Sequence, residues 1–149
     1  MDGAEMIRQA TVEDEGLLVS LFNDSSIVDY IGDDFTGEIN KIDVEKHLFL
    51  LCGSVGFFLL IPRSSVCYEI HTAFKEPARG EKVNKYSEAM FDWLRANTDC
   101  RKIIAEIPKS NFRAKAAAIK NGFVFHGINT KSFMKNGQLI DQLIYGKEL

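Results

Sequence analysis

Two ionisable residues, Glu69 and His71, stand close together in a segment whose composition predicts a β-strand, residues 66–74. Because side chains alternate across a strand, Glu69 and His71 share one face, and Cys67 and Ala73 lie on it too. A histidine titrates near neutral pH, so His71 can act as a general base, with Glu69 orienting it or holding a cationic group. The same pair could instead be ordinary polar residues on a half-exposed strand, with His71 hydrogen-bonded for structural reasons.

The predicted strand runs into a glycine-containing turn, Arg79-Gly80, and then into a helical pattern that begins at Glu81. The first N–H groups of a helix have no partner inside the helix, and the helix dipole favours negative charge there. This turn therefore predicts a site for an anion such as a pyrophosphate. An Arg-Gly pair alone is common and usually structural, so the prediction depends on the surrounding elements.

Hydrophobic periodicity predicts the elements that position these residues. The order is β-α-α-β-β-β-α-β-α-β-β, which indicates a single α/β domain with a mixed sheet flanked by helices. Asn136-Gly137 predicts a tight hairpin between the last two strands. The predicted strands are 7–10, 50–52, 55–62, 66–74, 102–107, 123–133 and 139–147, and the predicted helices are 11–22, 43–49, 81–96 and 111–120.

Length and composition limit the class of protein. The chain has 149 residues, 46% of them hydrophobic and 26% charged, which fits one globular domain. Its longest apolar run, residues 55–62, is too short to cross a membrane, and residues 1–5 lack the apolar core of a secretory signal. We therefore expect an N-terminal overhang over residues 1–5, a single domain over 6–149, and a cytoplasmic protein. The three cysteines, Cys52, Cys67 and Cys100, predict reduced thiols rather than a disulfide framework or a metal site.

Three motifs carry a family resemblance. One is the strand 67–74 followed by Glu76-Pro-Ala-Arg-Gly80, another is Asn111-Phe-Arg-Ala114 with Lys120-Asn-Gly-Phe123, and the third is the C-terminal hairpin. Together with the element order and the start at residues 6–14, they resemble the GCN5-related N-acetyltransferase (GNAT) family. The resemblance covers nearly the whole chain. The residue pattern Y-E-I-H-T-A-F…R-G looks closest to phage-borne members of the family. It implies the GNAT fold for the single domain.

The resemblance also implies acetyl-coenzyme A (acetyl-CoA) as cosubstrate and no metal. Its pyrophosphate would lie at the turn of Arg79 and Gly80, where Lys82 could supply a further cation or obstruct its approach. Phe74 would lie beside the pantetheine. Asn111 fits the family position that contacts the cofactor, and it can also cap the helix that follows it.

The chain departs from the family pattern in two places. The family's Q/R-x-x-G-x-G/A positions fall on Pro77, Gly80 and Lys82, so only the middle glycine is kept, and Asn84 replaces another frequent glycine. Ala118 occupies the position where many members carry a tyrosine that protonates the departing thiolate. These changes leave open a loop that no longer binds the cofactor.

The resemblance predicts an N-acetyltransferase that works by direct attack of an amine on acetyl-CoA in a ternary complex. His71 would take the ammonium proton, and Glu69 would orient His71 or hold the cationic acceptor. An alternative is a catalytically inactive GNAT-fold protein for binding or phage assembly, with or without CoA binding. The altered loop and Ala118 favour this alternative, whereas His71 and the Arg79-Gly80 pair favour the enzyme.

The acceptor would approach an acidic segment, residues 23–40, which lies where the family builds its acceptor-side loop. Its carboxylates could attract a small-molecule amine or a lysine side chain, or they could simply keep the loop soluble. Nothing in the chain predicts a nucleic-acid or membrane partner. Family members often dimerise through the sheet or its hairpin, so a homodimer is a further option. The acidic residues concerned are Asp24, Asp29, Asp33, Asp34 and Glu38.

Overall fold

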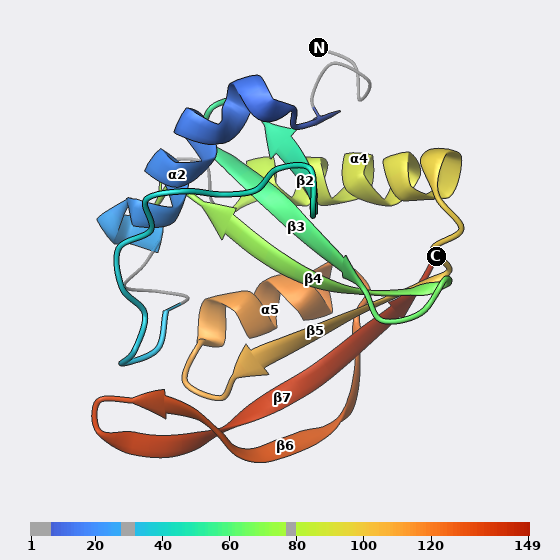
Figure 1. The fold of residues 1–149 in the computed structure, drawn as a ribbon. Coiled ribbons are helices and arrows are strands. Elements are labelled where there is room, and N and C mark those ends of the chain that lie inside the picture. Colours follow the sequence, from blue (N-terminus) through green and yellow to red (C-terminus); the bar gives the residue numbers. More distant parts are fainter. Residues whose placement is uncertain (1–6, 28–31, 77–79) are drawn as a thin grey trace.

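The chain folds around a seven-stranded mixed sheet (Figure 1). The computed structural model describes residues 7–27, 32–76 and 80–149. The strand order is β1-β2-β3-β4-β5-β7-β6, and β4 and β5 are parallel while the other neighbouring pairs are antiparallel. This arrangement confirms the predicted mixed α/β fold. The strands are β1 (Arg8–Gln9), β2 (Leu48–Cys52), β3 (Gly56–Pro62), β4 (Cys67–Phe74), β5 (Lys102–Pro108), β6 (Val124–Lys135) and β7 (Gln138–Glu148).

Helices cover both faces of the sheet. A short 3-10 helix, Val12–Asp14, leads into α2 (Glu15–Asn23), and α4 (Glu81–Asn97) connects β4 to β5. The last helix, α5 (Phe112–Lys120), lies between β5 and β6. Thr11 directly precedes the first helical turn, and its backbone N–H donates to the Asp14 carboxylate at 2.8 Å.

Two apolar clusters pack on opposite faces of the central strands. On one face, Leu50 and Phe58 pack with α4, whose Met90 is 1% exposed. On the other face, Phe49 and Phe57 pack with Leu18 and Leu21 of α2. The central strands therefore bury both faces, because consecutive residues of β2 serve different clusters.

The predicted helix over residues 43–49 is wrong. Residues 44–46 form a turn, and Leu48 already begins β2. The apolar run was ambiguous because a strand buried on both faces and a buried helix have the same unbroken pattern. A second helical segment lies earlier, since residues 25–27 of the acidic segment are helical.

The acidic segment is attached to the C-terminal hairpin. Asn136 and Gly137 both have positive φ, at 53° and 75°, which is the conformation expected for the predicted tight turn. The Asp34 carboxylate accepts hydrogen bonds from the N–H groups of Asn136 and Gly137, at 2.8 and 2.7 Å. The Lys135 ammonium donates to the carbonyl of Gly32 at 2.7 Å. These contacts join segments about a hundred residues apart in the chain.

We expect this attachment to depend on the charge of Asp34. The N–H groups of Gly137 and Asn136 lower the pKa of Asp34, so the attachment is complete above the ordinary Asp pKa and is lost as pH falls through the lowered value. Asp34→Asn should therefore reduce the hydrogen-exchange protection of the Asn136 and Gly137 amides at neutral pH. Asp92→Asn, which removes a carboxylate of α4, is the control, and unchanged protection in Asp34→Asn would contradict the expectation.

Candidate functional site

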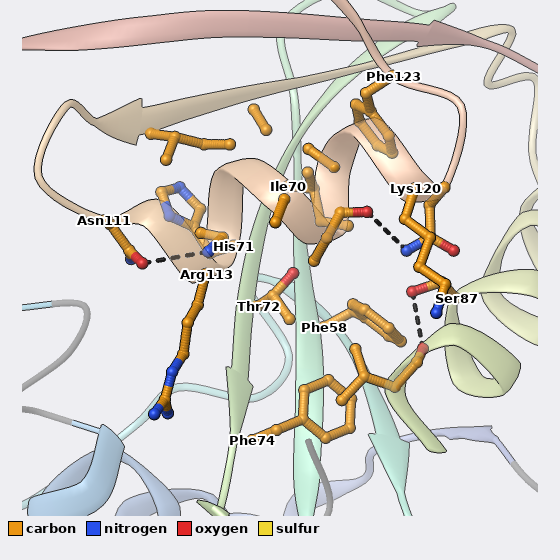
Figure 2. Close-up of a pocket in the computed structure, with 18 of the residues that line it drawn as sticks. Phe58, Ile70, His71, Thr72, Phe74, Ser87, Asn111, Arg113, Lys120 and Phe123 are labelled. Atoms are coloured by element: carbon orange, nitrogen blue, oxygen red, sulfur yellow. Dashed lines mark hydrogen bonds between the residues drawn. The ribbon is translucent and has the colours of Figure 1, made fainter. Parts of the chain in front are cut away.

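A cleft opens where β4 and β5 separate. The two strands pair only from Cys67 with Lys102 to Glu69 with Ile104, although β4 continues to Phe74. Beyond the last pair, the strands diverge and enclose a cleft of about 840 Å³ lined by both strands and by α4 and α5 (Figure 2). A ligand can therefore enter between two strands that elsewhere belong to one sheet.

Apolar side chains form much of the cleft wall. Ile70 and Phe74 come from β4, Phe58 comes from β3, and Met90 comes from α4. Phe74 is 5% exposed and stacks on Tyr86, with 5.7 Å between ring centroids. The structure thus places Phe74 in the cleft, as a residue beside a pantetheine would need to be.

The start of α4 lies at one end of the cleft. Gly80 lines it and has φ of 90°, a conformation that side-chain-bearing residues rarely adopt. A Cβ atom at Gly80 would meet no atom within 4 Å, so the demand for glycine is conformational and the space beside it is open. Lys82 is exposed and lies outside the described lining of the cleft. Arg79 and Pro77 lie outside the described residues.

The start of α4 and the end of α5 contact each other beside this turn. Asn121 Nδ2 donates to Asn84 Oδ1 at 3.1 Å, and Lys120 forms an ion pair with Glu81 at 2.9 Å. Asn84, Lys120 and Asn121 line the cleft. Asn84, which replaces a frequent family glycine, therefore has a structural partner here.

Asn111 lies at the start of α5 and lines the cleft. Its Oδ1 accepts from the N–H of Ala114 at 3.1 Å, so the predicted helix cap is confirmed (Figure 2). Arg113, two residues further along the chain, also lines the cleft and adds a cation that we did not single out from the sequence. It belongs to the Asn111-Phe-Arg-Ala114 motif, which was the available signal.

Glu69 and His71 meet as the strand pattern predicts. Nε2 of His71 lies 3.0 Å from Oε2 of Glu69, and Arg63 pairs with Oε1 of the same carboxylate. Burial raises the pKa of Glu69, but the hydrogen bonds from Arg63 and His71 outweigh it and hold the pKa below its ordinary value. Each carboxylate oxygen of Glu69 therefore already has one partner within this chain, Arg63 on Oε1 and His71 on Oε2.

Glu106 is a cleft carboxylate that the sequence analysis missed. Ile103 and Ile107 of β5 pack toward the helices α4 and α5, so Glu106 lies on the opposite face of the strand. The last β4–β5 pair is Glu69 with Ile104. His71 lies two residues after Glu69 on β4, and Glu106 lies two residues after Ile104 on β5, so they face the opening from opposite strands. A charged residue inside the apolar strand 102–107 was the available signal.

The described carboxylates of the acidic segment do not line the cleft. Asp33 accepts from the N–H of Phe35 at 2.9 Å, Asp24 accepts from Ser26, and Asp34 binds the hairpin turn. Asp29 lies outside the described residues. Asp24 and Asp33 organise the loop locally and Asp34 attaches it to the hairpin, so the described carboxylates of this segment do not form an acidic rim on the cleft lining.

Ala118 and Cys52 are both buried. Ala118 lines the cleft and packs with Ile107 and Tyr145, and no tyrosine is among the described lining residues. The three cysteines are free, and burial raises the pKa of Cys52. Among the described residues, no helix is long and apolar enough to cross a membrane.

No protein-family profile matches the chain, and no curated protein does. Solved structures do. A GNAT-family acetyltransferase from Streptococcus pneumoniae has a TM-score of 0.76 at 19% identity and covers 96% of this chain and 98% of its own. The ribosomal-protein-alanine N-acetyltransferase of Brucella melitensis has a TM-score of 0.73 at 20% identity, over 96% of this chain and 99% of its own. The spermidine N-acetyltransferase of Vibrio cholerae, in complex with CoA and spermine, has a TM-score of 0.74 at 14% identity, over 95% and 94%. The chain thus has the fold of the GNAT acetyltransferases.

Proposed function

We propose that this protein is an acetyl-CoA-dependent N-acetyltransferase that acts on a primary amine by direct attack. The observation that carries the proposal is the cleft between the diverging β4 and β5, with a helix start at one end and the Glu69–His71 pair beside it. The neighbour from Vibrio cholerae is complexed with CoA, which supports the same occupant for this cleft.

The residues of the cleft fit the cofactor. Gly80 leaves open space at the start of α4, where unpaired N–H groups favour an anionic pyrophosphate. Arg113 and Asn111 add polar groups from α5, and Phe74 offers an apolar wall for the pantetheine. Because Lys82 is exposed and outside the cleft lining, we assign it a supporting positive charge rather than a blocking role. The role of Arg79 stays a prediction.

When bound, acetyl-CoA supplies an activated acetyl thioester, and the attacking amine must be neutral. The Glu69 carboxylate only accepts hydrogen bonds, so the contact with His71 places the imidazole proton on Nε2. Nδ1 of neutral His71 then carries the free lone pair and can take the ammonium proton, directly or through a water. Formation of the N–C bond would accompany cleavage of the C–S bond, and the proton that the nitrogen loses on becoming an amide would pass to the departing thiolate, which leaves as the thiol.

Glu106 is the cleft carboxylate that we assign to the acceptor. It faces the opening on the same side as His71, and no hydrogen bond engages it among those of the described residues. Gln142 and Phe133 line the same part of the cleft. This combination suits a cationic amine with an apolar portion, as a small molecule or as a lysine side chain.

The alternative function is a GNAT-fold binding or phage-assembly protein without catalysis, with or without CoA binding. Ala118 favours it, because a methyl group stands where many family members have a proton donor and no tyrosine is among the described lining residues. The homodimer stays a prediction, supported by exposed apolar residues on the edge strand β6, such as Val124 and Phe125. A cytoplasmic location also stays a prediction.

Calorimetric titration with acetyl-CoA and with CoA tests the cofactor site. The native chain should bind both at micromolar affinity, and Gly80→Trp should abolish binding because its side chain enters the open space at the helix start. Gly137→Trp is a matched control, since Gly137 also has positive φ and open space but lies in the hairpin turn. Absence of binding to the folded native chain, or full binding by a folded Gly80→Trp variant, would overturn the proposed site.

Removing the proposed base should separate catalysis from binding. We expect His71→Ala to lower kcat by about 10²- to 10⁴-fold, the usual contribution of a positioned base, with CoA affinity unchanged. His47→Ala removes an exposed histidine outside the cleft and should leave kcat unchanged. An unaltered kcat in His71→Ala would remove His71 from the mechanism.

Glu106 should govern affinity for a charged acceptor. Glu106→Gln keeps the shape of the side chain and removes its charge, so the KM for a cationic amine should rise by about tenfold, the worth of one hydrogen bond to a charged group. The kcat should change little, and Glu88→Gln on the exposed side of α4 should change neither constant. A KM that does not respond to Glu106→Gln would place the acceptor elsewhere.

A further inference from the structure

Arg63 lies just beyond the cleft, in the turn between β3 and β4. Its backbone N–H donates to the carbonyl of Cys67 at 2.8 Å, which fixes the residue in the turn. Its side chain is 53% exposed, and its guanidinium reaches back to the Glu69 carboxylate. Arg63 thus contacts Glu69, the residue that is hydrogen-bonded to His71, but Arg63 itself lies outside the described lining of the cleft.

Glu69 needs such a partner because its side chain is only 10% exposed. A buried carboxylate is costly unless it is paired and hydrogen-bonded. Arg63 binds one oxygen and His71 the other, so the carboxylate bridges the two side chains. The position and the charge of Glu69 therefore both depend on Arg63.

We propose that Arg63 is a positioning residue, which acts through Glu69 to hold His71 oriented and neutral for proton transfer. The inference rests on the proposed function, in which His71 is the base. Arg63 offsets the negative charge of Glu69, so the carboxylate that contacts the imidazole does not act on it with its full charge. Without Arg63, the full charge of Glu69 would act on His71 and favour the imidazolium, which cannot accept a proton.

Other charged groups around His71 act in the same field. Glu106 faces the opening from β5, and its charge also acts on Arg63. Arg113 lines the cleft from α5. The residue opposite His71 on β3 is Leu59, which carries no charge. Among the described residues, Arg63 is the cation that contacts Glu69 directly. Its removal should therefore affect His71 more than removal of Glu106 or Arg113 would.

The test follows the His71 imidazole by NMR as a function of pH, in the native chain and in folded variants. In Arg63→Met, the midpoint of the His71 titration should move up by about one pH unit, the scale of the effect of a nearby charge. Arg63→Lys keeps the positive charge and should restore most of the native midpoint. Glu69→Gln should move the midpoint in the opposite direction, because it removes the carboxylate.

Arg95→Met is the control, since Arg95 is exposed to a similar extent as Arg63 but pairs with an exposed carboxylate, Asp92, on α4. It should leave the His71 midpoint unchanged. In the active enzyme, the acidic limb of the kcat profile should move with the midpoint in Arg63→Met, while CoA affinity stays constant. A role in folding alone would lower stability without moving either curve.

An unchanged His71 midpoint in folded Arg63→Met would overturn the inference. If Arg63→Met does not fold, Glu69→Gln and Arg63→Lys decide: a native midpoint in Glu69→Gln, or a strongly shifted one in Arg63→Lys, would overturn it. The NMR measurement needs no turnover. A failure to acetylate any amine would therefore count against the proposed function, whereas the titration tests the Arg63–Glu69–His71 arrangement by itself.

Discussion

The parallel pairing between β4 and β5 ends after Glu69 and Ile104, and the rest of the site depends on this ending. Beyond it, β4 still has β3 on its other side and β5 still has β7, so each strand keeps one hydrogen-bonded edge. Among the described residues, the edges that face each other across the opening have no strand partner. Backbone N–H and C=O groups need partners, so the opening is suited to an extended polar ligand that can supply them. Apolar clusters cover the two faces of the central strands.

Carboxylates in this protein differ in role because they differ in their partners. Glu69 is buried, and the hydrogen bonds from Arg63 and His71 keep it ionised despite burial. Asp34 is exposed, yet the two N–H groups of the hairpin turn engage it. Glu106 lines the cleft without such a bond among the described residues. The total charge of an acidic segment therefore says little about where a cation binds, since most of its oxygens can already be engaged by the chain itself.

Periodicity and turn residues predicted most elements close to their observed limits. The strand predicted from the composition of residues 66–74 anticipated β4, and Asn136-Gly137 anticipated the hairpin between β6 and β7. The helix expected over 43–49 failed because Leu48 to Cys52 are apolar on both faces, a pattern that burial against two clusters explains and that local periodicity could not resolve. Asn111 was correctly expected to cap its helix, because that interaction spans only three residues.

The sequence by itself determined the features that arise between near neighbours. Glu69 and His71 share a face because strand side chains alternate, and Gly80 stands where a helix begins because glycine permits its φ of 90°. Only the tertiary structure decided that β4 and β5 separate, that Glu106 faces His71 across the opening, and that Asp34 binds a turn about a hundred residues away. These contacts join segments that are distant in the chain. Their geometry follows from how the sheet and its two apolar clusters pack, which no local pattern records.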